Sequence, residues 1–263
     1  MTVSGSNSFR LDNKAAVITG GGSGIGEAIC LKFAAHGATV FVLDVNQKAA
    51  EDTAEKIKDA GGKAFAYACD VADQTKVKAQ FEAIAAQQRM HILVNNAGVS
   101  HIGSLENTTE ADFDRVFQVN VKGFYNCLLA AVGHMKESGG IILNMASIAG
   151  STGIADRFAY SMTKGAVIAM TYSVAKDYLS HNIRCNCISP ARVHTPFVDG
   201  YLQRNYPGRE QEMFEKLSKA QPIGRMARPD EVASLALYLC SEEASFITGM
   251  DYLLDGGFTH LRG

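Results

Sequence analysis

This sequence lacks several features that would assign a protein to a membrane, a nucleic acid or a metal. No apolar run approaches the roughly 20 residues that a helix needs to cross a bilayer. Lysine and arginine number 25 against 27 aspartate and glutamate residues, so the net charge is -2 and there is no basic excess for nucleic acid. The seven histidines show neither HxxxH nor HxH spacing. We therefore expect no membrane span, no nucleic-acid partner and no metal site.

Paired cysteines are also missing. The six cysteines form no CxxC pair and are scattered over 263 residues, so a disulfide framework is not indicated. We expect buried structural thiols in a reducing compartment. Residues 1–14 hold no apolar segment of the kind that secretion signals contain. These observations favour a cytoplasmic protein.

Short apolar runs alternate with amphipathic segments along the whole chain. The runs are typical of buried strands and lie at residues 15–19, 39–43, 64–68, 92–95, 141–145 and 184–188. Segments with helical spacing lie at residues 26–36, 47–60, 73–88, 111–135 and 158–179. This alternation indicates a parallel sheet covered by helices on both faces. Because there is no linker, repeat or low-complexity block, we predict that residues 1–263 form a single α/β domain.

A glycine cluster, TGGGSGIG at residues 19–26, follows the first predicted strand and opens the first predicted helix. Glycine costs backbone entropy and forfeits packing, so such a cluster needs a compensating reason. Helix N-termini carry unpaired N–H groups and partial positive charge, and a pyrophosphate can bind there when no side chain blocks it. A tight turn without a ligand is the alternative. The strand–loop–helix context favours a dinucleotide-binding loop.

Asp44 ends the second predicted strand, where a dinucleotide-binding fold places the acid that reads its ribose. A carboxylate at this place accepts hydrogen bonds from the adenosine ribose hydroxyls and repels the 2′-phosphate of NADP. No arginine or lysine lies in the glycine loop or directly after Asp44 to recruit that phosphate. The sequence therefore predicts NAD as the cofactor.

Tyr160 and Lys164 stand four residues apart, on one face of the last predicted helix. A nearby ammonium favours phenolate, which lowers the pKa of a tyrosine from about 10 toward the range of a general acid–base. YxxxK pairs also occur on solvated helix faces. Here the pair follows Ser147, which lies just past a strand end, so we expect both to reach the crevice at the carboxyl edge of the sheet.

These motifs resemble those of the short-chain dehydrogenase/reductase family, in the same order and over nearly the whole chain. The glycine loop resembles the TGxxxGxG motif of that family, and residues 95–98 resemble its NNAG motif. Asn120 matches its active-site asparagine, and Ser147, Tyr160 and Lys164 match its catalytic serine and YxxxK motif. The resemblance implies a Rossmann-type, doubly wound parallel sheet and hydride transfer at the C4 atom of nicotinamide.

The resemblance also implies a catalytic tetrad. Tyr160 would exchange a proton with the substrate oxygen, which Ser147 would orient. Lys164 would depress the pKa of Tyr160 and hold the nicotinamide ribose, and Asn120 would bind a water that links Lys164 to solvent. The contribution of the protein would be mainly positioning and electrostatics.

A set of cofactor contacts follows from the same resemblance. Asp70 would meet the adenine amino group and Thr195 the nicotinamide carboxamide. The predicted cofactor site consists of Gly20, Ser23, Gly24, Ile25, Gly26, Asp44, Asp70, Val71, Asn96, Ala97, Gly98, Tyr160, Lys164, Pro190, Val193 and Thr195. Residues 251–257 resemble the carboxy-terminal strand of the family, whose edge usually belongs to a tetramer interface, so we expect a homotetramer.

One departure from the family pattern follows the sixth predicted strand. The family usually shows Pro-Gly there, whereas this chain has Pro190 and Ala191, followed by Arg192. A second arginine, Arg157, lies about one helical turn before Tyr160. Two guanidiniums near one catalytic tyrosine indicate an anionic substrate, since arginine grips a carboxylate with a bidentate fork. The alternative is that each arginine forms an ion pair with a neighbouring acid.

Residues 156–160 and 183–187 resemble the branch of the family that contains 3-hydroxybutyrate and 2-keto-3-deoxy-sugar-acid dehydrogenases. That resemblance implies a small hydroxy or keto acid as substrate, with Ser147, Arg157 and Arg192 as candidate substrate residues. Residues 195–221 correspond to the variable substrate lid of the family. Their polar side chains suit a small polar substrate better than a sterol or a long acyl chain.

Two other functions stay open at this point. A 3-oxoacyl-[acyl-carrier-protein] reductase usually calls for NADPH and for a basic surface, and Asp44 and the net charge of -2 argue against both. A dinucleotide-binding protein without catalytic activity would keep the scaffold, but the complete tetrad argues against it. The leading hypothesis is an NAD-dependent dehydrogenase of a small hydroxy acid or sugar acid.

Overall fold

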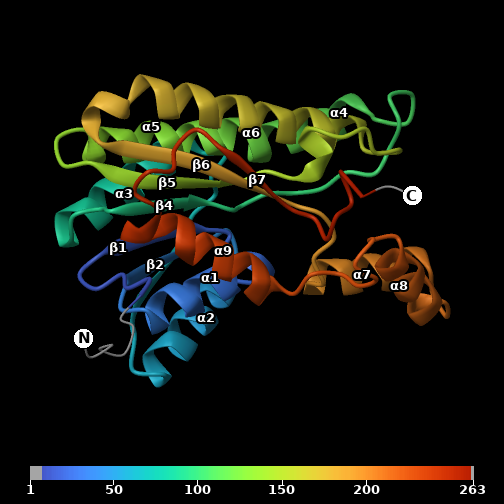
Figure 1. Ribbon diagram of the computed structural model, residues 1–263, viewed down its shortest axis with the longest axis horizontal. Coiled ribbons are helices and arrows are strands. Elements are labelled where there is room, and N and C mark those ends of the chain that lie inside the picture. Colours follow the sequence, from blue (N-terminus) through green and yellow to red (C-terminus); the bar gives the residue numbers. More distant parts are fainter. Residues whose placement is uncertain (1–7, 262–263) are drawn as a thin grey trace.

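The computed structural model describes residues 8–261, which are built around one seven-stranded sheet with all neighbouring strands parallel (Figure 1). The strands are β1 (Ala15–Thr19), β2 (Thr39–Asp44), β3 (Lys63–Ala68), β4 (Ile92–Asn95), β5 (Gly140–Met145), β6 (Ile183–Pro190) and β7 (Asp251–Leu254). Their order in the sheet is β3-β2-β1-β4-β5-β6-β7. The order reverses between β1 and β4, and a crevice forms at such a point beyond the carboxyl ends of the strands.

Helices cover both faces of this sheet (Figure 1). One face is covered by α1 (Gly24–Ala35), α2 (Gln47–Asp59) and α9 (Pro229–Cys240). The other is covered by α3 (Gln74–Gln87), α4 (Glu110–Phe117), α5 (Gly123–Met135) and α6 (Phe158–Asp177). Two further helices, α7 (Pro196–Asn205) and α8 (Glu210–Lys219), lie outside both layers. The fold is the doubly wound, Rossmann-type α/β fold that the sequence predicted.

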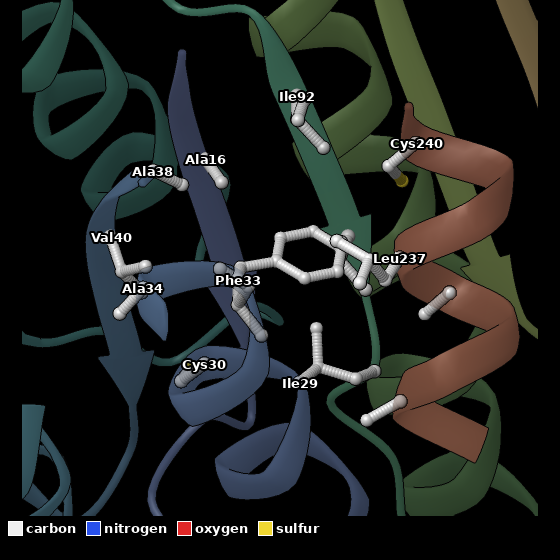
Figure 2. Packing of buried hydrophobic residues seen from close by; sticks show 14 of the residues in the cluster. Ala16, Ile29, Cys30, Phe33, Ala34, Ala38, Val40, Ile92, Leu237 and Cys240 are labelled. Carbon is white, nitrogen blue, oxygen red and sulfur yellow. The ribbon is translucent and has the colours of Figure 1, made fainter. Parts of the chain in front are cut away.

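The core between α1, α9 and the sheet shows why the chain folds in this way. Phe33 of α1 points toward Leu237 of α9, with Ile29 and Ile92 on either side (Figure 2). Phe33, Ile29 and Ile92 have no exposed surface, and burial of one such side chain stabilises the fold by about 1.5–3 kcal/mol. All five residues of β1 are buried, as a strand covered on both faces requires. All six cysteines are buried as well, which confirms that prediction.

The predicted strands are confirmed, with β6 extending one residue earlier and two later than the predicted 184–188. The prediction of one α-helix over residues 111–135 is wrong in its middle. A π-helical turn at Gln118–Lys122 separates α4 from α5 there. Such a turn inserts one residue into the helical repeat, which the spacing of apolar residues does not reveal. Neither α9 nor the two helices of residues 195–221 were predicted.

Two further findings concern only the described part of the chain, residues 8–261. None of its helices combines the length and the apolar character that crossing a bilayer requires. It also holds no group of three or more His, Cys, Asp or Glu side chains placed to bind a metal ion.

Candidate active site

The π-helical turn carries Asn120 into the interior of the molecule, where its side chain is fully buried. Its Oδ1 accepts a hydrogen bond from the Val99 N–H at 2.8 Å. Its Nδ2 donates to the Val99 carbonyl at 2.8 Å and to the Thr163 hydroxyl at 3.1 Å. Asn120 therefore joins the loop after β4 to α6. Its partner on α6, Thr163, directly precedes Lys164. The water that we expected it to bind stays a prediction.

Ser147 lies just after β5, at the start of a short 3-10 turn (Ile148–Gly150). Its hydroxyl accepts a hydrogen bond from the Ala149 N–H at 3.2 Å and donates to the Pro190 carbonyl at 3.5 Å. The pKa of Tyr160 responds to the same hydroxyl, so the two side chains lie close together. The structure thus brings the predicted serine and tyrosine together, and it links both to the end of β6.

Lys164 is buried beneath this pair, with an exposed fraction of 4%. Its Nζ donates to the Met145 carbonyl at 2.7 Å and lies 5.4 Å from the centre of the Phe124 ring. Burial lowers the pKa of Lys164 to about 8. An amine with this pKa exchanges its proton near physiological pH, as a residue that carries protons must do.

The Tyr160 side chain has two positive charges nearby. Burial of the phenol raises its pKa above the ordinary value of 10, although Ser147 and the positive charge of Arg157 both act to lower it. The Lys164 ammonium lies over the Tyr160 ring, 5.8 Å from the centre, and donates to the Met145 carbonyl. The expected effect of Lys164 on the pKa of Tyr160 stays a prediction. Arg157, expected only to bind substrate, is thus a positive charge that favours the phenolate.

The glycine loop is folded so tightly that side chains are excluded from it. A Cβ atom on Gly26 would lie 2.0 Å from the carbonyl oxygen of Gly20, and Gly20 itself has a φ of 63°. The Asn96 amide donates to the carbonyls of Thr19 and Gly20 at 3.1 and 3.0 Å. Ser23 precedes α1 without a side-chain hydrogen bond to its first turn. The loop is thus tied to the end of β4, and its helix N-terminus fits a pyrophosphate.

Asp44 faces this loop, as predicted. One carboxylate oxygen accepts a hydrogen bond from the Gly22 N–H at 3.0 Å, and the other accepts from the Asn46 N–H at 2.9 Å. Each carboxylate oxygen can accept a further hydrogen bond. Lys48 is the first basic residue after Asp44, and it pairs with Asp52. The surroundings of Asp44 therefore fit ribose hydroxyls and offer no described cation to a 2′-phosphate.

Other predicted cofactor residues line the carboxyl ends of the strands. The Thr195 side chain packs against the glycine loop, since a Cβ atom on Gly24 would lie 3.3 Å from its Cγ2. A Cβ atom on Gly98 would lie 3.7 Å from the Lys164 Nζ. The Ala97 N–H donates to the Thr19 hydroxyl at 3.1 Å. Residues from distant parts of the chain thus meet along one crevice.

Four more predicted residues belong to the same edge of the sheet. The Asp70 carboxylate accepts a hydrogen bond from the Ala72 N–H at 3.0 Å. Val71 and Val193 are buried, and Ile25 packs against the core between α1 and α9. These contacts show where the residues lie. Their contacts to a cofactor stay predictions.

Arg157, which acts on Tyr160, and Arg192 form an arginine cluster. Arg157 donates to the Ser100 hydroxyl at 3.1 Å and to the His101 carbonyl at 3.2 Å. Burial and the charge of Arg157 lower the pKa of Arg192, so the two guanidiniums lie near each other. Within residues 8–261, neither makes an ion pair with an acid. Asp199, one possible partner, instead contacts His194 at 2.8 Å.

Comparison with known proteins agrees with this geometry. The family model described as enoyl-(acyl carrier protein) reductase matches residues 20–259. The chain is 39% identical over 254 residues to the uncharacterized oxidoreductase YxbG of Bacillus subtilis, covering 94% of this chain and 92% of that one. It is 36% identical over 253 residues to the D-threitol dehydrogenase of Mycolicibacterium smegmatis, covering 95% of each.

A solved structure shares the whole fold. This is 7α-hydroxysteroid dehydrogenase in complex with NADH and 7-oxo glycochenodeoxycholic acid, which is 34% identical. Its TM-score is 0.86, with 95% of this chain and 96% of that chain covered. Fold, motifs and relatives agree, and the chain belongs to the short-chain dehydrogenase/reductase family of oxidoreductases.

Proposed function

We propose that this protein is an NAD-dependent dehydrogenase that interconverts the secondary alcohol and the ketone of a small hydroxy acid or sugar acid. The observation that carries the proposal is the pair formed by Arg157 and Arg192. The Arg157 guanidinium lies near Tyr160 and also near Arg192, and no described carboxylate neutralises either arginine. Like charges at close range raise the free energy of a site unless an anion lies between them.

The cofactor would be held by the tight loop around Gly20 and Gly26, with Asp44 on the adenosine ribose and Thr195 near the nicotinamide. NAD would accept or return a hydride at the C4 atom of its nicotinamide. The preference for NAD over NADP is supported by the Asp44 carboxylate, which is held in place by two backbone N–H groups. The related 7α-hydroxysteroid dehydrogenase was solved with NADH.

The side chains would divide the remaining work. The phenol of Tyr160 would carry the proton to or from the substrate oxygen, and Ser147 would hold that oxygen in line. Lys164, whose pKa is about 8 because it is buried, would pass the proton onward from beneath the phenol. The positive charge of Arg157 would stabilise the phenolate that forms when Tyr160 has given up its proton.

Residues 195–221 would act as a lid over the substrate, and residues 1–263 would form one domain of a cytoplasmic homotetramer without nucleic-acid or membrane partners. The assembly proposal is supported by β7, an edge strand whose four residues are all half-buried in the single chain. The D-threitol dehydrogenase relative acts on a neutral polyol. Two unpaired guanidiniums would have no use in such a site, and we therefore favour an acid.

The experiment compares an acid with its neutral counterpart. Arg157→Met and Arg192→Met are tested with 3-hydroxybutyrate and with butane-1,3-diol, in which an alcohol replaces the carboxylate. Loss of a hydrogen bond to a charged group costs about 1.5–3 kcal/mol, so we expect KM to rise about 10- to 100-fold for the acid. KM for the diol should stay close to that of the wild type.

Arg10→Met is the matched control, because Arg10 forms an exposed ion pair with Asp12 and lies outside the lid. Thermal stability is measured for every variant. Equal losses on the acid and on the diol would contradict the anionic substrate and leave the dehydrogenase activity standing. No oxidation of any secondary alcohol with NAD would contradict the proposed function as a whole.

A further inference from the structure

Two tyrosines of the lid form a pair that the proposed chemistry does not use. Tyr201 lies in the middle of α7, and Tyr206 is the residue directly after this helix. Their hydroxyl oxygens are 3.4 Å apart. Their rings meet edge to face, with centres 5.9 Å apart and planes at 76°. Both phenols are therefore held at one place by packing as well as by their hydroxyl groups.

This pair lies beside the arginine cluster. The charges of Arg157 and Arg192 both act to lower the pKa of Tyr201, against the larger upward effect of burial and of Tyr206. Both phenols in turn act on the pKa of Arg192. Electrostatic effects of this kind fall off steeply with distance, so the four side chains share one region. Both tyrosines are therefore within electrostatic range of the arginines that the proposed function assigns to the substrate.

The start of α7 fixes the place of this pair relative to the cofactor loop. Thr195, the residue directly before α7, packs against Gly24 of the glycine loop. Tyr201 follows within the next two helical turns. A bound substrate would place its reacting carbon at the nicotinamide and its carboxylate at the arginines. The remaining part of the substrate would therefore contact the two phenols.

A phenol can donate one hydrogen bond and accept others. A substrate hydroxyl could bond to this pair without leaving a polar group unpaired. A methyl group at the same place would displace water from the phenols without forming a hydrogen bond to them. For this reason, sites that bind a hydroxyl group discriminate against analogues that lack it.

We infer that Tyr201 and Tyr206 determine specificity by reading a second hydroxyl group, so that the enzyme prefers a polyhydroxylated acid to one with an apolar end. This inference rests on the proposed function, because it assumes that the site oxidises a small hydroxy compound. It narrows the substrate class from hydroxy acids in general to acids of the sugar type.

Four compounds separate the two features of the substrate. 3-Hydroxybutyrate and 3,4-dihydroxybutyrate differ only in one terminal hydroxyl group, and so do their neutral counterparts, butane-1,3-diol and butane-1,2,4-triol. The wild-type enzyme, Tyr201→Phe and Tyr206→Phe are measured with NAD on all four. Tyr67→Phe serves as the control. Tyr67 lies on β3, away from the lid, and its phenol accepts a hydrogen bond from Gln87 at the end of α3.

We expect the wild type to prefer 3,4-dihydroxybutyrate over 3-hydroxybutyrate about 10-fold or more in kcat/KM. Each lid variant should reduce this ratio to below about 3-fold, by lowering kcat/KM for the dihydroxy acid alone. Tyr67→Phe should keep the wild-type ratio. A structural role of the tyrosines would instead lower kcat/KM for both acids equally.

Absence of a preference in the wild type, or equal losses on both acids in the variants, would overturn the inference. The arginine proposal is tested on the other axis, acid against neutral compound. Suppose that kcat/KM is no higher for the acids than for their neutral counterparts, but is higher for the triol than for the diol. The recognition of a second hydroxyl group is then supported, and the proposal of an anionic substrate is wrong. If none of the four compounds is oxidised, both are wrong.

Discussion

The floor of the active site and the lid are held together in different ways. We define the floor as Asn120, Ser147 and Lys164, three buried polar side chains that bond to backbone atoms of separate elements. The described ion pairs of the lid, residues 195–221, are exposed pairs of side chains, such as Arg209 with Glu212. A hollow of about 380 Å³ lies between its two helices. The floor is therefore anchored to the backbone of the fold, whereas the ion pairs of the lid lie at its surface.

This difference separates chemistry from specificity. Proton transfer needs atoms held within hydrogen-bond distance, and backbone partners at the ends of β5 and β6 and in the loop after β4 provide that precision. Substrate choice needs surfaces that can vary between relatives, and exposed side-chain pairs on a lid provide that freedom. Arg157 and Arg192 belong to neither group: Arg157 donates to Ser100 and to the His101 carbonyl, and Arg192 lies within electrostatic range of the lid tyrosines.

The largest effect is expected directly above the floor, from removal of the Tyr160 hydroxyl group. Tyr160→Phe should lower kcat by about 10³-fold or more, since a positioned acid–base is worth 10²–10⁴ in rate. The affinity for NAD, measured by fluorescence or calorimetry, should stay within about twofold, because only the proton carrier is lost. Near-normal turnover in this variant would show that the chemistry lies elsewhere.

Asp44 is held by backbone N–H groups in the manner of the floor, and it should set the choice of cofactor. Asp44→Ala should reduce the ratio of NAD to NADP efficiency about 10- to 100-fold, which corresponds to about 1.5–3 kcal/mol for a lost charged hydrogen-bond partner. The measurement is kcat/KM for both cofactors. An unchanged ratio of NAD to NADP efficiency would show that Asp44 does not contact the cofactor.

The buried amine of the floor should make stability depend on pH. Burial lowers the pKa of Lys164 to about 8, against 10.5 in an exposed lysine. Between these values the unfolded chain holds the extra proton, so the free energy of unfolding rises with pH. The cost of burying the charged amine is fully present below pH 8 and is relieved as the pH rises toward 10.5.

Lys164→Met should remove this dependence. From about pH 7.5 to about pH 10, the wild type should gain ~1–3 kcal/mol of stability relative to the variant, because one pKa unit corresponds to about 1.4 kcal/mol. Urea unfolding at several pH values measures this difference. If the difference in the free energy of unfolding between the wild type and Lys164→Met does not change with pH, Lys164 is not buried as described.

The smallest effect is expected in the lid. His194 and Asp199 are about half exposed, at 46% and 50%, and exposed pairs contribute only ~0.2–1 kcal/mol. Asp199→Asn should therefore keep the free energy of unfolding within ~1 kcal/mol of the wild type. A loss of stability well above this range would show that the lid is as tightly fixed as the floor.

Sequence reasoning located the sheet and most of the site because both depend on local patterns. Buried parallel strands are short apolar runs, and the glycine loop, Asn96 and Ser147 each follow a strand end that the pattern identifies. Helix α9 could have been predicted from its first turn, which begins with Pro229 followed by Asp230 and Glu231. These residues are typical of a helix N-terminus.

The sequence by itself determined the order of strands and helices, and the places where chemical groups meet the carboxyl edge of the sheet, because spacing along the chain specifies both. Only the tertiary structure decided that Arg157 and Arg192 lie near each other without a described acid, and that the lid tyrosines are within electrostatic range of them. It also decided that burial outweighs the nearby charges at Tyr160. Distance and desolvation depend on how remote segments pack, and no local pattern records them.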